Sequence, residues 1–425
     1  MLYYAQGSPD LELTADECRN ALAEVLEQFV DRDRVLVVPP DYTRFDSQSG
    51  MLTSLLYDLL GSRLTDVLPA LGTHDMMSDE QIERMFPGVP RSLFREHRWR
   101  EDAILLDHVP GDYVSDVTEG IYDKPWPVEV NRMIADRTHD LVISVGQVVP
   151  HEVIGMANYN KNLFVGTGGR EGINESHFIG AVYGMERMMG VADTPLRRIL
   201  NYAQDNFCRG WPLLYVQTVV ASKEDGTLAL RGLYIGDDVE CFLKASELSA
   251  QVNFTVLDSP PKKFVVYLDE QKFHSTWLGN KAIYRTRMAI ADGGELVVLA
   301  PGVKMFGEDR QIDRLIYKYG YRTTPEVLHG VEQNEDLRNN LSAAAHLIHG
   351  SPENRFRVTY CPGGLSKAEI EGVGYGYGNL ANMCDRYDPA KLRPGTNVVD
   401  GEEIYFIPKP ALGLWASRDR APKGA

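Results

Sequence analysis

Apolar residues occur in short runs along the first half of the chain. Val, Ile and Leu dominate these runs, which cover 34–40, 64–74, 103–110 and 140–150. Because the runs are largely continuous rather than alternating with polar residues, they are typical of parallel strands covered on both faces. The pattern predicts an N-terminal α/β domain that is doubly wound and mostly parallel.

Two capping-box signatures mark helices between the apolar runs. Thr14 is followed three positions later by Glu17, ahead of an amphipathic segment. Ser78 and Gln81 have the same spacing at the start of another helical segment. In such a pair each side chain accepts a hydrogen bond from the backbone of the other residue, which satisfies amides at a helix N-terminus. We expect one helix to begin after Thr14 and another after Ser78.

A hairpin and a linker are predicted in the middle of the chain. The apolar stretches 213–221 and 228–236 are separated by KEDGT at 223–227, which predicts a β-hairpin that extends the first sheet. The charged, Pro-rich stretch 258–263 then indicates a linker or hinge.

The alternation of strands and helices resumes beyond this linker. A helix is predicted near 281–291, and strands are predicted at 264–268, 295–302, 356–360 and 403–410. The chain is therefore expected to form two α/β domains, residues 1–260 and 261–425, with a cleft between them. Clefts of this kind commonly bind ligands at the carboxyl ends of parallel strands.

Composition and charge narrow the class of partner. Of the 425 residues, 44% are hydrophobic and 24% are charged, as in ordinary soluble proteins. The net charge of −16 argues against a nucleic-acid partner, which would require clustered Lys and Arg. The chain has no apolar run of about 18 residues and its N-terminus does not resemble a signal peptide, so neither a membrane span nor secretion is expected. Five scattered cysteines without a C-x-x-C pair indicate reduced thiols in a cytoplasmic protein.

Chemically versatile side chains follow three of the predicted strands. Asp41 and Arg44 come after the first strand, His74 follows the second, and His151 follows 140–150. Lys161 lies ten positions beyond His151, and His177 lies sixteen positions beyond Lys161. Taken singly, each has an ordinary explanation, such as a local salt bridge or a hydrogen-bonded core histidine. The glycine-rich stretch 166–172 is either a plain turn or, ahead of a helix, a phosphate cradle.

Together these motifs resemble the lactate racemase family, whose members use a nickel-pincer nucleotide. The chain carries D-x-T-R at 41–44, G-T-H at 72–74 and H-x(9)-K-x(15)-H from His151 to His177, in the family's order and with its spacings. The resemblance implies an isomerase that inverts the C2 centre of a 2-hydroxy acid by reversible hydride transfer. It also implies separate enzymes that mature the cofactor.

The resemblance assigns a role to each motif. Lys161 is expected to tether the cofactor covalently, and His177 is expected to be the only protein ligand of nickel. His74 and His151 are expected to act as the paired acid and base. The expected cofactor-binding segment consists of Asp41, Tyr42, Thr43 and Arg44.

Departures from the family's pattern bear on the substrate. Asp75 replaces an arginine after G-T-H, and 157–160 replace a Ser-Gly-Gly motif before the lysine. In the C-terminal half, Arg285 follows Tyr284 where lactate-specific enzymes carry glutamine. Arg44, Tyr284 and Arg285 are therefore candidate substrate-binding residues. A larger, more polar 2-hydroxy acid, such as an aldonate, is expected rather than lactate.

Two other classes of function remain open. A zinc-dependent hydrolase would use His74, His151 and His177 as metal ligands. A non-catalytic, two-lobed protein would bind a sugar or nucleotide without turnover. Neither alternative gives Lys161 a role.

Overall fold

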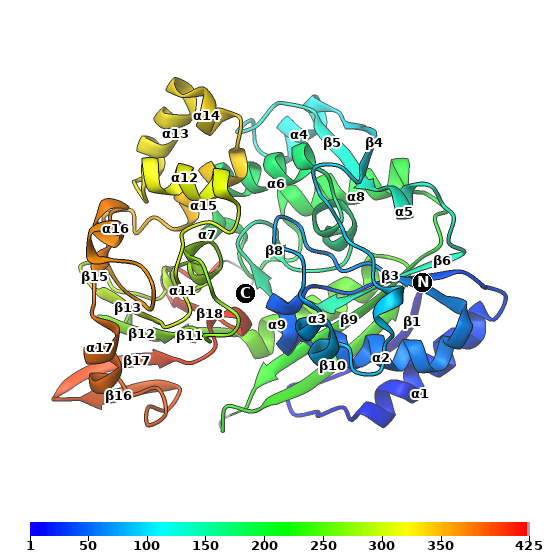
Figure 1. The fold of residues 1–425 in the computed structure, drawn as a ribbon, viewed down its shortest axis with the longest axis horizontal. Helices are drawn as coiled ribbons and strands as arrows, with labels where there is room; N and C mark the ends of the chain where they lie inside the picture. The colour runs from blue at the N-terminus through cyan, green and yellow to red at the C-terminus, as the bar shows by residue number, and fades with distance from the viewer. Residues whose placement is uncertain (224, 423–425) are drawn as a thin grey trace. The chain divides into compact units, whose positions relative to one another are not determined.

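The computed structural model describes residues 1–223 and 225–422, which form two compact units. The first unit contains Met1–Ile179, Met189–Lys223 and Thr227–Val252, and the second consists mainly of Gly180–Met188 and Asn253–Ala425. The domain boundary expected between residues 260 and 261 stays a prediction. Each unit is built on its own six-stranded sheet (Figure 1).

The sheet of the first unit has the strand order β1-β10-β9-β6-β2-β3. Its strands are β1 (Leu2–Gly7), β2 (Val35–Val38), β3 (Leu64–Val67), β6 (Leu141–Gln147), β9 (Leu213–Ser222) and β10 (Leu228–Gly236). Neighbours from β9 to β3 pair in parallel, whereas β10 and β1 join the edge in antiparallel pairing. The predicted hairpin is therefore confirmed as β9 and β10, although Glu224 in its turn lies outside the described residues.

Helices cover both faces of this sheet. Consecutive residues of β2 enter different apolar cores: Val35 and Val37 pack on one face, Leu36 and Val38 on the other. The helices of the unit are α1 (Ala15–Leu26), α2 (Ser49–Leu60), α3 (Asp79–Met85), α4 (Gly111–Val117), α5 (Arg132–Ala135), α6 (Arg170–Tyr183), α8 (Pro195–Phe207) and α9 (Val239–Asn253). Two-sided burial confirms the doubly wound α/β class and explains why the strand sequences are continuously apolar.

Both predicted capping boxes are present. Thr14 accepts from the backbone of Glu17 at the start of α1, and the Glu17 carboxylate accepts from the backbone of Thr14. Ser78 and Gln81 make the equivalent bonds at the start of α3.

The run 103–110 was wrongly predicted to belong to the parallel sheet. It forms β4 (Ala103–Val109), which pairs antiparallel with β5 (Trp126–Asn131) in a separate two-stranded sheet. Leu105 on this strand is 50% exposed, so the run is not covered on both faces. A short apolar run does not distinguish these two environments.

The sheet of the second unit has the strand order β15-β14-β13-β12-β17-β16, with only β16 antiparallel to its neighbour. Its strands are β12 (Lys263–Tyr267), β13 (Glu295–Ala300), β14 (Arg357–Pro362), β15 (Gly376–Tyr377), β16 (Gly395–Val399) and β17 (Glu402–Ile407). A parallel pair, β11 (Phe254–Leu257) and β18 (Leu414–Ser417), lies beside it in the same unit. The four strands predicted here are confirmed.

Helices connect the strands of the second unit. They are α10 (Thr276–Gly279), α11 (Lys281–Thr286), α12 (Arg310–Tyr319), α13 (Thr324–Gln333), α14 (Glu335–Arg338), α15 (Leu341–His349), α16 (Lys367–Gly372) and α17 (Leu380–Arg386). A further short helix, α7 (Met185–Met188), comes from the separate segment Gly180–Met188 of this unit. The helix predicted at 281–291 ends early, at Thr286.

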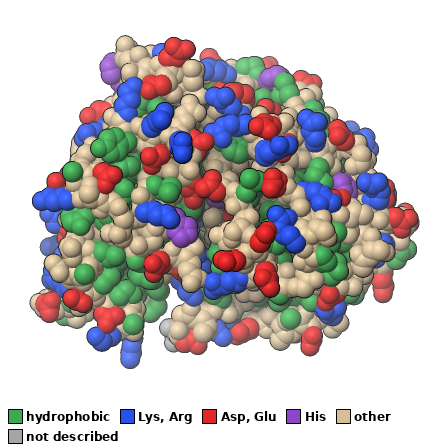
Figure 2. All heavy atoms as spheres, viewed as in Figure 1, with side chains coloured by type: hydrophobic (Ala, Val, Ile, Leu, Met, Phe, Trp, Pro, Cys, Tyr) green, Lys and Arg blue, Asp and Glu red, His purple; other side chains and the backbone are tan. Residues whose placement is uncertain are grey.

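Acidic and basic side chains are interspersed over the face seen in Figure 2. Among the described residues, no helix is both long enough and apolar enough to cross a membrane. All five cysteines are free thiols.

Candidate active site

The candidate site lies at the carboxyl edge of the first sheet. Strands β6, β2 and β3 are parallel neighbours, so their carboxyl ends lie side by side at this edge. Asp41 follows the end of β2, His74 follows β3, and His151 lies in β7 (Pro150–His151), just after β6. The strand order therefore brings together residues that are far apart in the sequence.

Asp41 and His74 form a hydrogen-bonded pair. Oδ2 of the buried Asp41 lies 2.5 Å from Nδ1 of His74, and its Oδ1 accepts bonds of 2.8 and 2.5 Å from the amide and hydroxyl of Thr43. Burial alone raises the pKa of Asp41, but the charge and hydrogen bond of His74 and the bond from Thr43 lower it to about 2. An ionised carboxylate only accepts, so Nδ1 of His74 carries a proton, and in the neutral ring the lone pair is then on Nε2.

His151 holds its proton on the opposite ring nitrogen. Its side chain is buried, and its Nδ1 accepts the backbone N–H of Val153 over 3.1 Å. A nitrogen that accepts carries no proton, so the neutral ring is protonated on Nε2. His74 and His151 therefore differ in tautomer.

His177 is held in a neutral form suited to metal binding. It lies on α6, where Nδ1 donates to the carbonyl of Ile173 over 2.7 Å, leaving the Nε2 lone pair outside this bond. Burial lowers the pKa of His177 to about 4 against the raising effect of that bond, and the charges of Lys161 and His74 lower it further. These two side chains therefore lie within electrostatic reach of His177.

Lys161 lies between a strained loop and an unusual helical turn. Asn158 and Tyr159 before it have positive φ angles of 67° and 57°. Directly after it, Asn162–Gly166 form a π-helical turn, η5, a form often found at functional sites. The Asn162 side chain bonds to the hydroxyl of Ser144 on β6 over 3.2 Å, which ties the start of this turn to the sheet.

The glycine-rich stretch is closely packed. The amide of Gly72 donates to Gly166 over 2.8 Å, joining the G-T-H loop to this stretch, and a Cβ at Gly168 would lie 2.0 Å from the carbonyl oxygen of Phe164. At the start of α6, the Gly172 amide donates to the Glu129 carboxylate over 2.7 Å. A carboxylate therefore already binds one of the amides that could hold an anion, and phosphate binding by this stretch stays a prediction.

The expected cofactor-binding segment forms the 3-10 turn η2 (Tyr42–Ser47), capped by Asp41. Tyr42 is buried against Phe45, with ring centroids 5.4 Å apart. Arg44 is half-buried and its charge lowers the pKa of Asp41, after the larger effects of His74 and Thr43. Among the described residues, no carboxylate forms an ion pair with Arg44.

Tyr284 and Arg285 lie in the second unit, on α11. Both are buried, and the Tyr284 hydroxyl lies 2.9 Å from Nδ1 of His346. Nε2 of His346 lies 2.9 Å from the hydroxyl of Tyr321, so a tyrosine holds each ring nitrogen. Sequence spacing gives no sign of this chain of hydrogen bonds.

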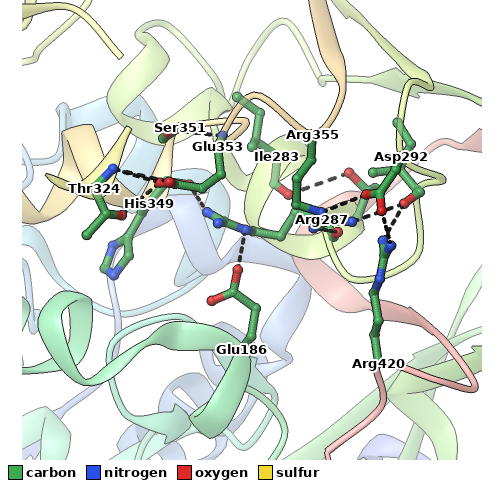
Figure 3. Close-up of polar contacts among 12 residues, drawn as sticks. Glu186, Ile283, Arg287, Asp292, Thr324, His349, Ser351, Glu353, Arg355 and Arg420 are labelled. Atoms are coloured by element: carbon green, nitrogen blue, oxygen red, sulfur yellow. Dashed lines mark hydrogen bonds and ion pairs between the residues drawn. The ribbon is translucent and has the colours of Figure 1, made fainter. Parts of the chain in front are cut away.

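An ion-pair network anchors the end of α11 (Figure 3). Nε of Arg287 lies 2.7 Å from the carboxylate of Glu186, which comes from α7. Arg355 donates to the carbonyl of Arg287 over 3.0 Å and pairs with Asp292, which Arg420 also contacts. The network fixes the turn directly after the two candidate substrate-binding residues.

The described residues contain no group of three His, Cys, Asp or Glu side chains arranged to hold a metal ion. This offers no support for a three-histidine zinc site.

Comparisons with known proteins agree with the motifs. Residues 14–189 match the family described as lactate racemase N-terminal domain. A crystal structure of a protein from Thermotoga maritima is 25% identical, with a TM-score of 0.83 over 96% of this chain and 100% of that one. The lactate racemase apoprotein from Thermoanaerobacterium thermosaccharolyticum shares the fold, at 13% identity and a TM-score of 0.69 over 95% of this chain and 93% of that one. No curated protein matches the sequence.

Proposed function

Because residues 14–189 match the lactate racemase N-terminal domain family, we propose that this chain is a racemase or epimerase that inverts the C2 centre of a 2-hydroxy acid. A nickel-pincer nucleotide would serve as its cofactor. The observation that carries the proposal is that the protein engages Nδ1 of each of His74, His151 and His177 in a hydrogen bond.

The residues present fit such a cofactor. A pre-chelated nickel needs one neutral imidazole, and His177 supplies it, because Nδ1 donates to Ile173 and the ring stays neutral at physiological pH. Lys161, whose charge reaches His177, would hold the nucleotide covalently. When bound, the cofactor would supply a reversible hydride acceptor, as nicotinamide does in dehydrogenases.

The two remaining histidines suit proton transfer at the substrate hydroxyl. Nε2 of His74 would accept the hydroxyl proton, and the Asp41 carboxylate would stabilise the resulting imidazolium. His151, protonated on Nε2 in its neutral form, would donate a hydrogen bond to the oxygen in the opposite orientation, and would deliver a proton there only as an imidazolium. Inversion places the hydroxyl in two orientations, so one histidine for each is the simplest arrangement.

The substrate would be larger and more polar than lactate. Arg44 would bind the substrate carboxylate or the cofactor phosphate, since a guanidinium matches either group with paired hydrogen bonds. Tyr284 and Arg285 would recognise further hydroxyls. An aldonate has the required 2-hydroxy acid group and the additional hydroxyls.

The test combines intact mass with a substrate screen. The chain is produced together with cofactor-maturation enzymes, its mass is measured, and single enantiomers of lactate and of aldonates are tested for inversion. We expect an adduct on Lys161, nickel in the protein, and turnover of an aldonate. Lys161→Arg should lose the adduct, whereas Lys124→Arg, at an exposed position, should keep it.

Three outcomes separate the parts of the proposal. An adduct with lactate turnover would contradict only the aldonate assignment. Zinc in place of nickel, with hydrolase activity, would favour the metal-hydrolase alternative. A protein that binds aldonates without adduct or turnover would be a binding protein.

A further inference from the structure

A buried arginine lies beneath the loop that leads to Lys161. Arg197 on α8 is 1% exposed, and no carboxylate of the described chain pairs with it. Its guanidinium donates to the carbonyls of Met156 and Asn158 over 2.8 and 3.2 Å, and to the side-chain oxygen of Asn160. Among the described residues, the aromatic rings of Phe242 and Tyr159 also lie close to it, with centroids 4.2 and 5.8 Å from the guanidinium carbon.

Burial lowers the pKa of Arg197 to about 9, so the group stays protonated at neutral pH. Keeping a charge in such a place is costly unless hydrogen bonds replace its water shell. Here the replacement consists of acceptors that belong to one loop, residues 156–160. This cationic side chain is therefore directed at a single segment.

The backbone of the loop 156–160 adopts an energetically unfavourable conformation. Asn158 and Tyr159 are consecutive non-glycine residues with φ angles of 67° and 57°. Each such residue costs about 1–2 kcal/mol and persists only where its surroundings enforce it. Two further contacts assist: Asn158 donates to Gln217 over 2.9 Å, and the Tyr159 ring lies 4.4 Å from that of Tyr215.

We propose that Arg197 is a positioning residue for Lys161: its guanidinium binds the loop 156–160 in a left-handed path and so fixes where the lysine emerges. Lys161 is the next residue in the chain and the N-cap of the π-helical turn. Its position therefore depends on the path of this loop. The role of Lys161 as a cofactor tether rests on the proposed function, whereas the fixing of its position by Arg197 does not.

A lysine cannot replace this arginine. The guanidinium uses NH1 for Asn160 and NH2 for both backbone carbonyls, and its planar fork reaches all three acceptors at once. An ammonium keeps the charge but concentrates it at one point. Arg197→Lys should therefore break hydrogen bonds to the loop even though it keeps the positive charge.

The experiment compares Arg197→Lys with Arg198→Lys in the cofactor-free protein. Arg198 is the neighbouring residue on α8, half-exposed and paired with Asp193, which makes it a matched control. Amide exchange across 156–162 and acetylation of Lys161 by a small N-hydroxysuccinimide ester are both followed by mass spectrometry. For Arg197→Lys we expect about a tenfold loss of exchange protection, equivalent to roughly 1.4 kcal/mol of local opening, and faster acetylation of the half-buried Lys161.

A second substitution tests the hydrogen bonds themselves. Asn160→Ala removes one acceptor of Arg197 and should give a smaller local loss of protection than Arg197→Lys. It also keeps the proposal testable if Arg197→Lys does not fold.

Equal exchange in the two lysine variants would overturn the proposal, as would loss of protection spread evenly over the whole chain. Because no cofactor is involved, absence of a Lys161 adduct in loaded protein would refute the proposed function and leave this inference intact.

Discussion

Oδ2 of Asp41 lies 2.5 Å from Nδ1 of His74, and Thr43 holds the other carboxylate oxygen. This aspartate, expected from the family resemblance to line the cofactor, has both oxygens engaged within the protein. Its observed bond to Nδ1 orients the ring of His74. Cofactor binding by Asp41 stays a prediction.

Replacing Asp41 with asparagine should strongly reduce the rate of inversion. An amide cannot stabilise an imidazolium, and its NH2 group would favour the wrong tautomer of His74. We expect kcat to fall roughly 10³- to 10⁴-fold, as in other histidines that lose an orienting aspartate. Asp10→Asn, at an exposed position near the N-terminus, is the control and should keep nearly full activity. Similar rates for the two variants would show that the pair has no role in turnover.

Asp41 should also contribute to stability in a defined pH range. Its pKa falls from 3.8 in the unfolded chain to about 2 in the folded protein, so the folded state binds its proton less readily. The contribution is present above pH 4, is lost as the pH falls towards 2, and amounts to roughly 2 kcal/mol. Urea unfolding at pH 5, 3 and 2 should show this loss in the native protein and a smaller one in Asp41→Asn. Parallel curves would contradict the assignment.

His177 should remain neutral well below the usual pH range of histidine. Burial lowers its pKa to about 4, whereas an unperturbed imidazole titrates near 6.5. The unfolded chain therefore takes up this proton first, and stability should decrease as the pH falls from about 6.5 to 4. Histidine resonances followed by NMR in the cofactor-free protein should include one with a midpoint near 4 that is missing in His177→Gln. A midpoint above 6 for that resonance would rule out the buried neutral state.

The glycine-rich stretch should not tolerate even one added methyl group. A Cβ at Gly168 would lie 2.0 Å from the carbonyl oxygen of Phe164, within the segment that follows Lys161. Gly168→Ala should lower the free energy of unfolding by about 1–3 kcal/mol, the usual cost of overpacking. Gly372→Ala is the matched control, because nothing lies within 4 Å of its added Cβ. Chemical denaturation of both variants provides the measurement, and equal midpoints would refute the expectation.

The strand assignments could be made from the sequence because burial on both faces leaves a clear pattern. The runs at β2, β3 and β6 are continuous for that reason, and the exits of such strands identified Asp41, His74 and His151. The run at β4 has a similar apolar composition but pairs with β5 in a separate sheet. The strand with which it pairs depends on contacts between distant residues, so residue type alone could not predict it.

Contacts between distant residues account for what sequence reasoning missed. Asp41 and His74 are 33 positions apart, and Arg197 is 36 positions beyond Lys161. Likewise, Glu129 on β5 accepts a hydrogen bond from the amide of Gly172 on α6. One signal was available: the Thr two positions after Asp41 is typical of a capping turn, in which the aspartate accepts from the backbone. The turn alone, however, does not predict which histidine contacts the second carboxylate oxygen of Asp41.

The opposite tautomers of His74 and His151 have a consequence for kinetics. A resting enzyme in which Nε2 of one imidazole can accept a proton and Nε2 of the other already carries one is not equally prepared for the two C2 configurations of its substrate. One configuration finds its proton acceptor in place, whereas the other requires His151 to break its bond with the Val153 amide and move its proton to Nδ1. Under the proposed function, the first turnover should therefore be faster for one C2 epimer than for the other.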